Sequence, residues 1–520
     1  MGSRAPSPAT GLRLADVLAA LSLATDLGVG APMETALRTC LLATALGQRL
    51  GLGGAELATV YFAALMRHLG CTAWAHEAAE LAGDDHDLLR TFEGVDRTRK
   101  SKLLGRAVAR LAPGQPAGAR VLTIARVLTQ PSAGNRLAAA QCAQAEALAE
   151  DLGLGSAVVT ALAQMYERHD GRGGPHHLRG EQISLAGQLI HLAQVLEALL
   201  RQLGPARALA ELEGRRGTQF SAAVVDAALG SRDLVTELAS SATLWEQVLA
   251  IEPAPVRTVE LAHLPQIALA FARFADLKSP HRVGHSPAVA ALADRAAERA
   301  GLSAEDRTRL RISALLHDLG TVSVSNATWD HAGALGASAW EQVRLHAHYG
   351  ERILARSPLT QPFAALVGGH HERMDGSGYH RNARGDSIEQ LARILGAADC
   401  WVALTSRRPH RDALAAPDAS QCLTREASAG RLCRDAVALV QAAAGQPVTR
   451  AALPAGLTER EAEVLRHLAR GLVSKEIASV LGIATRTVKH HIEHIYEKTG
   501  VTTRAAAALF AARNDLVGPD

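Results

Sequence analysis

Hydrophobic side chains recur three and four positions apart along most of this 520-residue chain, as they do on the buried face of an amphipathic helix. The spacing is clear at 41–47 and at 143–152, and glycine and proline interrupt it. Two interruptions are rich in proline, one around Pro253 and Pro255 and one from Pro447 to Pro454. They divide the chain into three predicted domains, at 1–252, 256–446 and 454–520.

The amino-acid composition favours one fold class. Hydrophobic residues make up 48% of the chain but aromatic residues only 3%, which favours packing of small residues between helices over β-sandwiches. We therefore predict an all-α protein. The net charge of +3 is too close to neutral to predict nucleic-acid binding, so such a prediction needs a motif.

Sequence signals for a membrane or an oxidising compartment are not found. No apolar run approaches the roughly 18 residues of a membrane helix, and residues 1–10 have no basic-then-apolar signal pattern. The six cysteines stand far apart without a Cys-x-x-Cys pair, so we expect buried thiols rather than disulfides or a zinc site. These features predict a cytoplasmic protein that binds no membrane.

The first two predicted domains resemble each other, and we call them the first copy (1–252) and the second copy (256–446). Residues 65–70 align with 315–320, and 167–173 align with 372–378, with matching glycines and charges as well as hydrophobic residues. The aligned positions that differ in chemistry, first copy before second, are Thr35 and His285, Arg67-His68 and His317-Asp318, Met165-Tyr166 and His370-His371, and Gln194 and Asp399. This pattern indicates a duplicated scaffold whose first copy has lost its polar ligands.

The second copy collects residue types that bind divalent transition metals. A helix predicted from Ser303 to Leu319 carries His317 and Asp318 near its end, before Gly320. A carboxylate at that position suits a bridge between two metals, which together would activate water for attack on a phosphate ester. The other candidate ligands on helix-compatible segments are His285, His346, His370, His371 and Asp399.

These motifs, with the loop after His371, resemble the HD-GYP subfamily of helical phosphohydrolases, which is known for cleaving cyclic di-GMP. The likeness spans about 276–439 and rests on His317-Asp318, on 370–379 and on Lys278-Ser279-Pro280. It implies two divalent metals, iron or manganese, a catalytic role for Asp318, and a cyclic dinucleotide or other phosphoester as ligand. The implied metal ligands are His285, His317, Asp318, His346, His370, His371 and Asp399, and the implied substrate loop contains Asp375, Gly376, Gly378 and Tyr379.

Three residues of the second copy depart from the HD-GYP pattern. Thr321 replaces a common lysine, so a cation that would meet substrate phosphate is missing. His380 replaces the proline of the signature, and His281 stands where some members have a further glutamate ligand. Loss of cyclic di-GMP hydrolysis, a different phosphoester substrate and metal-dependent sensing are all open. The first copy is expected to bind no such metal cluster and to serve as a regulatory domain or a packing remnant.

The last domain, which we call the tail (454–520), has helix signals at short spacing. Thr458 and Glu461 form a predicted capping box, and Ser474 and Thr485 are predicted to cap two further helices. The predicted helix stops are Gly471, Gly482 and Gly500. Two short helices joined by a three-residue turn predict a helix-turn-helix.

The third predicted tail helix has one buried and one exposed face. Val488, Ile492 and Ile495 form its apolar stripe, which turns the opposite side chains toward the DNA major groove. The segment resembles the LuxR-type helix-turn-helix over 457–509, which implies double-stranded DNA as a partner. The implied DNA-binding residues are Thr485, Arg486, Thr487, Lys489, His490, Glu493 and Lys498, with base contacts from Lys489, His490 and Glu493.

From Leu457 onward the chain has nine Lys and Arg and eight Asp and Glu, so its net positive charge is small. Nonspecific DNA affinity should therefore be modest, and a homodimer is expected. The predicted architecture is two tandem HD-type helical domains followed by a small four-helix helix-turn-helix domain. The favoured function is a DNA-binding transcriptional regulator coupled to the metal-binding copy. The alternative is a metal-dependent phosphodiesterase that the tail localises.

Overall fold

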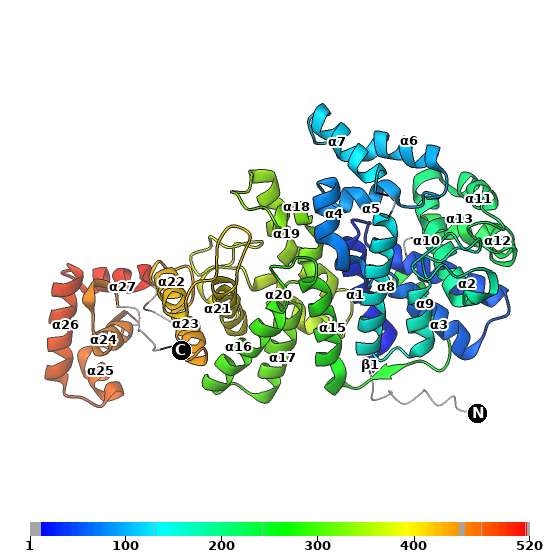
Figure 1. Cartoon of the computed structure of the whole chain (residues 1–520). Coiled ribbons are helices and arrows are strands. Elements are labelled where there is room, and N and C mark those ends of the chain that lie inside the picture. The colour runs from blue at the N-terminus through cyan, green and yellow to red at the C-terminus, as the bar shows by residue number, and fades with distance from the viewer. Residues whose placement is uncertain are drawn as a thin grey trace, which may run out of the picture. The chain divides into compact units, whose positions relative to one another are not determined.

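The computed structural model describes residues 12–130, 132–241, 243–446, 453–469, 471–514 and 516. Their regular secondary structure is almost entirely helical, which confirms the predicted all-α class (Figure 1). Within them the only strands are β1 (Leu12–Arg13) and β2 (Thr258–Val259), which pair antiparallel with Leu12 opposite Val259. The segment 1–10, for which we predicted no signal peptide, and part of the second predicted linker, 447–452, lie outside the described residues.

The helices of each predicted domain follow one another with short connections. The first copy contains α1 (Leu14–Gly28), α2 (Thr35–Arg49), α3 (Gly54–Leu65), α4 (Ala75–Ala82), α5 (Asp85–Phe92), α6 (Lys100–Arg110), α7 (Ala117–Leu128), α8 (Ala133–Asp151), α9 (Ser156–Ala163), α10 (Leu185–Leu203), α11 (Pro205–Glu213), α12 (Ala222–Leu229), α13 (Arg232–Ser240) and α14 (Leu244–Ala250). The second copy contains α15 (Leu264–Asp276), α16 (His285–Arg299), α17 (Ala304–Leu316), α18 (Asn326–Trp329), α19 (Ala337–Leu354), α20 (Gln361–Gly369), α21 (Gln390–Thr405), α22 (Ala416–Ser428) and α23 (Arg434–Ala443). The tail contains α24 (Glu459–Ala469), α25 (Ser474–Leu481), α26 (Thr485–Thr499) and α27 (Arg504–Arg513). None of the helices in the described residues is both long and apolar enough to cross a membrane.

The described residues fall into two compact units. The first unit lies within Met1–Asp294, Ser303–Gly368 and Ser406–Ala413, and the second within Arg295–Leu302, Gly369–Thr405 and Leu414–Asp520. The first unit therefore includes helices from both copies. The boundaries of the three domains that we predicted from the sequence stay predictions.

Helix α1 is a central element of the first unit. It is buried along almost its whole length, from Leu14 to Gly28, because its sequence is apolar on every side rather than on one stripe. It packs against α2 of the first copy and against α19 and the 3₁₀ helix η4 (Leu319–Ser323) of the second. Since η4 directly follows His317 and Asp318, α1 supports the segment that carries the predicted metal-binding pair.

The loop that follows the aligned Glu has the same hydrogen bonds in both copies. The Glu167 carboxylate accepts hydrogen bonds from the backbone N–H groups nine and eleven residues later, at 2.7 and 3.0 Å. The Glu372 carboxylate accepts them at the same two offsets, at 2.7 and 2.8 Å. Gly171 and Gly376, four residues after each Glu, have left-handed backbones with φ of +76° and +80°. The structure thus repeats where the sequence does, which supports the predicted duplication.

A glycine in each copy allows two backbone segments to approach closely. A Cβ atom at Gly70 would lie 1.8 Å from the carbonyl oxygen of Gln141, and one at Gly320 would lie 2.0 Å from that of His346. Gln141 therefore occupies the place of His346 in the first copy, a correspondence that the sequence alignment missed. The prediction that α17 continues to Leu319 was wrong: the helix ends at Leu316, and Gly320 lies in η4, where it serves this close approach and does not stop the helix.

The tail has the four predicted helices around one apolar core, to which Val464, Leu465 and Val488 contribute. The capping box is confirmed, since Thr458 N–H donates to Glu461 at 2.7 Å and Glu461 N–H donates to Thr458 Oγ1 at 3.2 Å. The predicted caps at Ser474 and Thr485 were wrong by one residue, because these residues open α25 and α26 and the caps are Val473 and Ala484. At α25 the Glu476 carboxylate accepts from Val473 N–H at 2.7 Å, so the cap needs no side-chain oxygen.

The prediction that the cysteines are buried thiols is correct in part. All six cysteines are free, and Cys40, Cys71 and Cys142 are buried as expected. Cys400, Cys422 and Cys433 are half-buried instead.

Candidate metal centre

The Asp318 carboxylate lies among three imidazoles of the first unit. His285 opens α16, His317 caps the end of α17, and His346 lies on α19, and all four side chains are buried. Asp318 Oδ2 is 3.1 Å from Nε2 of His317 and 3.5 Å from Nε2 of His285. Asp318 Oδ1 is 3.6 Å from Nε2 of His346. The two oxygens of one carboxylate thus face different imidazoles, which is the arrangement that a carboxylate bridging two metals requires.

Backbone carbonyls orient two of these imidazoles. Nδ1 of His317 lies 2.7 Å from the carbonyl oxygen of Ala314, and Nδ1 of His346 lies 2.5 Å from that of Val343. A carbonyl oxygen can only accept, so each Nδ1 must carry the proton and donate it. Each Nε2 then presents a lone pair toward Asp318, as metal-binding histidines do when a carbonyl holds the other ring nitrogen.

A cation stands beside Asp318 that the sequence reasoning did not identify. Arg282 forms a buried ion pair with the Asp318 carboxylate, and its guanidinium lies 4.9 Å from the centre of the Trp329 ring. Thr321, which replaces the family's lysine, is buried and donates its hydroxyl to the Asp318 carbonyl at 2.6 Å. The charge missing at Thr321 is therefore present nearby at Arg282. The only feature of the sequence that could have indicated this role of Arg282 is its position between Lys278 and His285.

Three further predicted ligands lie in the second unit. His370 and His371 directly follow α20, and their ring centres are 4.1 Å apart. His371 also stacks on Tyr379 with 4.7 Å between ring centres. Asp399 is buried on the apolar helix α21, where an ionised carboxylate is costly without a partner.

The predicted substrate loop is held in shape by its glycines. The exposed Asp375 carboxylate accepts from Ser377 N–H at 2.9 Å across a tight turn. Gly376 adopts φ of +80°, and a Cβ at Gly378 would lie 2.5 Å from the Arg373 nitrogen. Side chains at these two positions would strain or displace the turn, so the glycines fix how the loop leaves His371.

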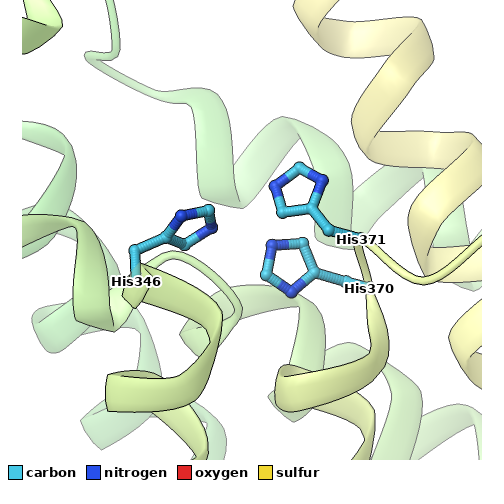
Figure 2. A group of neighbouring side chains, drawn as sticks. All are labelled: His346, His370 and His371. Atoms are coloured by element: carbon cyan, nitrogen blue, oxygen red, sulfur yellow. The ribbon is translucent and has the colours of Figure 1, made fainter. Parts of the chain in front are cut away.

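All seven predicted ligands belong to groups of neighbouring donor atoms. Within each group the donor atoms lie within 4.8 Å of one another, and the groups are His346, His370 and His371; His285, His317 and Asp399; and His317, Asp318 and His370. Figure 2 shows the first group, with the rings of His346 and His370 turned toward one another. Buried imidazole and carboxylate donors in this number fit a site for divalent transition metals.

In the first copy an arginine occupies the position aligned with His317. Arg67 is fully buried, 3.5 Å from Nδ1 of His68, and His68 in turn lies 3.5 Å from Asp26. Burial raises the pKa of Asp26 to about 7, although the charge of Arg67 lowers it. Burial and the same arginine lower the pKa of His68 well below its usual value. A fixed guanidinium thus supplies positive charge where the second copy has a metal-ligand pair.

In the tail the predicted recognition face is exposed. Arg486, Thr487, Lys489, His490 and Glu493 are solvent-exposed on α26, whereas Val488 and Ile495 are fully buried. The prediction of an outward-facing polar surface is therefore confirmed. Thr485 is half-buried at the start of the helix. The remaining candidate, Lys498, forms an ion pair within the tail, with its Nζ 2.7 Å from Glu461 Oε2.

Comparisons with known proteins identify both parts of the chain. The HD domain family model matches residues 136–224 and 270–433, and the model for bacterial regulatory proteins of the luxR family matches 455–511. The chain is 32% identical over 406 residues to 3'3'-cGAMP-specific phosphodiesterase 3 of Vibrio cholerae, covering 77% of this chain and 88% of that protein. The crystal structure of a cyclic GMP-AMP specific phosphodiesterase of V. cholerae, V-cGAP3, has a TM-score of 0.57 at 28% identity and covers 84% of this chain and 98% of that one.

The tail has relatives of its own. It is 53% identical over 53 residues to the nitrate/nitrite response regulator protein NarP of Escherichia coli, a match that covers 10% of this chain and a quarter of NarP. The family matches, the long alignment with the Vibrio protein and the clustered histidines and aspartates of the second copy agree with one another. The chain belongs to the HD domain family, in its HD-GYP-like branch, and carries a C-terminal luxR-family helix-turn-helix domain.

Proposed function

We propose that the chain is a metal-dependent phosphodiesterase whose second copy hydrolyses a cyclic dinucleotide, with a tail that binds double-stranded DNA. The observation that carries the proposal is the position of the Asp318 carboxylate, whose two oxygens face different imidazoles that can bind metal. The long similarity to a protein named for hydrolysis of 3'3'-cGAMP favours that class of substrate. It also favours the phosphodiesterase over the pure transcriptional regulator as the main function.

The proposed roles follow from where the side chains lie. His285, His317, Asp318 and His346 would hold the metals together with His370, His371 and Asp399. Two bound divalent metals, iron or manganese, would lower the pKa of a water and stabilise negative charge on the phosphate. Hydrolysis would add one water across one phosphodiester bond, leaving a phosphate monoester and a free sugar hydroxyl, and would so open the cyclic dinucleotide to a linear one.

Two further groups would contact the substrate. Arg282 is the cation nearest to Asp318, and its position against Trp329 keeps the guanidinium beside the metal ligands, where it would bind phosphate in place of the lysine missing at Thr321. Tyr379 stacks on the ligand His371, so the loop from Asp375 to Tyr379 would border the bound nucleotide. His371 couples the position of that loop to the metal site.

Metal content and turnover of the purified chain test the proposal. We expect about two divalent metals per chain and conversion of 3'3'-cGAMP to a linear dinucleotide in the presence of manganese. Asp318→Ala should lose the metals and the activity, whereas Glu305→Ala, which removes an exposed carboxylate from the preceding helix α17, should retain both. A protein that holds its metals but turns over neither 3'3'-cGAMP nor cyclic di-GMP with manganese or iron would contradict catalysis and leave metal-dependent sensing as the function.

The exposed face of α26 favours a second function, transcriptional regulation by a DNA-bound homodimer. Lys489→Ala removes a cation from this face and should abolish specific DNA binding without changing turnover. If the tail only localises the enzyme, DNA affinity will be the same with and without metal and 3'3'-cGAMP. A change of tenfold or more on adding either ligand would instead assign the tail a regulated output, because coupling between two sites appears as such a factor.

A further inference from the structure

The first copy contains a large pocket although it lacks the metal ligands. The pocket encloses about 850 Å³, which lies within the usual range for small-molecule sites. His68, Tyr166 and Gln194 line it, and these three residues align with Asp318, His371 and Asp399 of the second copy. The pocket of the first copy therefore lies where the second copy has its predicted metal ligands. Residues of other types line it.

The pocket wall carries excess positive charge. Arg97, Lys100 and Arg172 line it, are solvent-exposed, and make no side-chain ion pair within the described part of the chain. Arg168 also lines the pocket, but its charge is compensated by Asp170 at 2.9 Å and by a second carboxylate. The one acidic residue of the lining, Glu93, is 2.6 Å from Arg201 and thus neutralised too. Three uncompensated cations in the lining of one pocket favour an anionic ligand.

Other residues of the lining suit a flat aromatic group. Trp74, Phe92 and Tyr166 belong to the lining, and several leucines are also part of it. The Tyr166 hydroxyl donates to Gln141 at 2.7 Å, which fixes the ring in the wall. The amides of Asn135 and Gln194 lie in the same lining and can both donate and accept, as the edge of a base requires. Stacking and amide contacts beside cations are the features by which proteins bind nucleotides.

We infer that the first copy is a metal-independent binding site for a nucleotide, with the phosphate held by Arg97 and Arg172 and the base against the aromatic wall. The inference concerns a site separate from the proposed catalytic centre and does not require that the second copy be catalytic. It gives the first copy a ligand-binding role in place of that of a packing remnant. Arg67 fits this role, since its buried guanidinium supplies fixed charge near His68 without a metal.

Equilibrium binding of 3'3'-cGAMP to the full chain tests the inference when metals and turnover are removed. The protein is the Asp318→Ala variant in a metal chelator, titrated with 3'3'-cGAMP and, in a separate arm, with inorganic phosphate. We expect saturable binding of one 3'3'-cGAMP per chain, weakening as salt is added because the contacts are charged. Inorganic phosphate should bind at least a hundredfold more weakly, because it cannot use the aromatic wall.

Variants of exposed arginines assign the binding to the pocket. In the Asp318→Ala background, Arg97→Ala and Arg172→Ala should each raise the dissociation constant at least about tenfold, as expected for loss of a charged hydrogen bond. Arg110→Ala is the matched control, since Arg110 is an exposed arginine of α6 outside the pocket, and it should bind as the parent does. The helical circular dichroism signal of each variant should equal that of the parent.

Two outcomes would overturn the inference: no saturable binding of 3'3'-cGAMP, or binding that neither arginine variant weakens. These outcomes are independent of the phosphodiesterase proposal, which is tested by metal content and turnover of the chain with Asp318 intact. Binding that Arg97→Ala abolishes in a chain without any turnover would support the first-copy site and contradict only the catalytic proposal.

Discussion

Lys278 and Asp85 form a buried ion pair that joins the two copies within the first unit. The Lys278 ammonium is 2.6 Å from Asp85 Oδ2, and both side chains are fully buried. The other carboxylate oxygen accepts from Ser325 Oγ at 2.9 Å and from the Asn326 N–H at 2.8 Å. Burial raises the pKa of Asp85, but the charge of Lys278, the neighbouring His86 and the hydrogen bonds from Lys278 and the Asn326 N–H together outweigh it and bring that pKa to about 2. The Lys278-Ser279-Pro280 motif thus has a structural partner that its sequence does not show.

Removing this carboxylate should destabilise the protein strongly. Asp85→Ala leaves the Lys278 ammonium buried without a countercharge, and breaking a buried pair in this way costs about 3–5 kcal/mol. We expect a clearly lower urea midpoint in equilibrium unfolding at neutral pH. Glu77→Ala, which removes an exposed carboxylate from the neighbouring helix α4, should shift that midpoint little. Equal midpoints for both variants would contradict the role of the pair.

Among single residues, chemistry was easier to predict than contacts. His285, His317, Asp318 and His346 could be named as candidates because few residue types ligate transition metals and these occurred in a recognisable order. The ion pair of Arg282 with Asp318 could not, because an arginine in a sequence carries no mark of the partner that folding brings to it. The same holds for Asp85, which lies almost two hundred positions before Lys278.

At the scale of elements, the contact between η4 and α19 sets the distance from Asp318 to His346. Gly320 permits this contact, because a Cβ there would lie 2.0 Å from the His346 carbonyl oxygen and 2.7 Å from the Gly350 nitrogen. Gly320→Ala should therefore push η4 away from α19, weaken metal binding about tenfold or more and lower the unfolding midpoint. Gly336→Ala, at a position with open space around it, should leave metal affinity unchanged in the same titration. Wild-type affinity in Gly320→Ala would show that the contact does not set the site.

The ion pair between α24 and α26 should make tail stability depend on pH. Burial raises the pKa of Glu461, but hydrogen bonds from Lys498 and Thr458 lower it more, to about 2. A depressed carboxylate pKa means that the stabilisation is complete above the unfolded value, near 4.5, and is lost as pH falls toward 2. We expect α24 and α26 to exchange amide hydrogens faster in Lys498→Ala than in the wild type at pH 6. This difference should shrink at pH 2.5, and a constant ratio of the two rates would contradict the assignment.

Element boundaries show where sequence patterns stop being informative. The tail helices were predicted nearly to the residue, because glycines at 471, 482 and 500 adopt positive φ and end them as expected. The end of α17 was misplaced because Gly320 was interpreted as a stop signal, whereas its small size serves a contact with a distant helix. A glycine therefore predicts the end of a helix where only local conformation decides the residue. The prediction fails where, as at Gly320, a contact with a distant helix requires the glycine.

For the whole molecule, duplication in the sequence does not mean that each copy folds alone. The second copy obtains part of its support from the first: α1 packs against η4 and α19, Asp85 neutralises Lys278, and the Thr72 hydroxyl donates to the Phe274 carbonyl at 2.8 Å. All these groups belong to the first unit. The sequence indicated a repeat and a proline-rich boundary, but nothing in it showed how much surface the copies share.

A chain shortened to 256–520 should therefore lose the metal centre even though every predicted ligand is present. Without the first copy, the apolar side chains of η4 and α19 that α1 covers would face water, and Lys278 would remain without Asp85. We expect this shortened chain to bind fewer than the full complement of metals and to show no turnover. Its mean helicity should also be lower, as measured by circular dichroism. Adding residues 1–252 as a separate polypeptide during refolding is the control, and it should restore metal binding at least in part. If 256–520 alone holds as many metals as the full chain, the second copy is an independent domain, and the contacts of α1 and Asp85 are accessory to it.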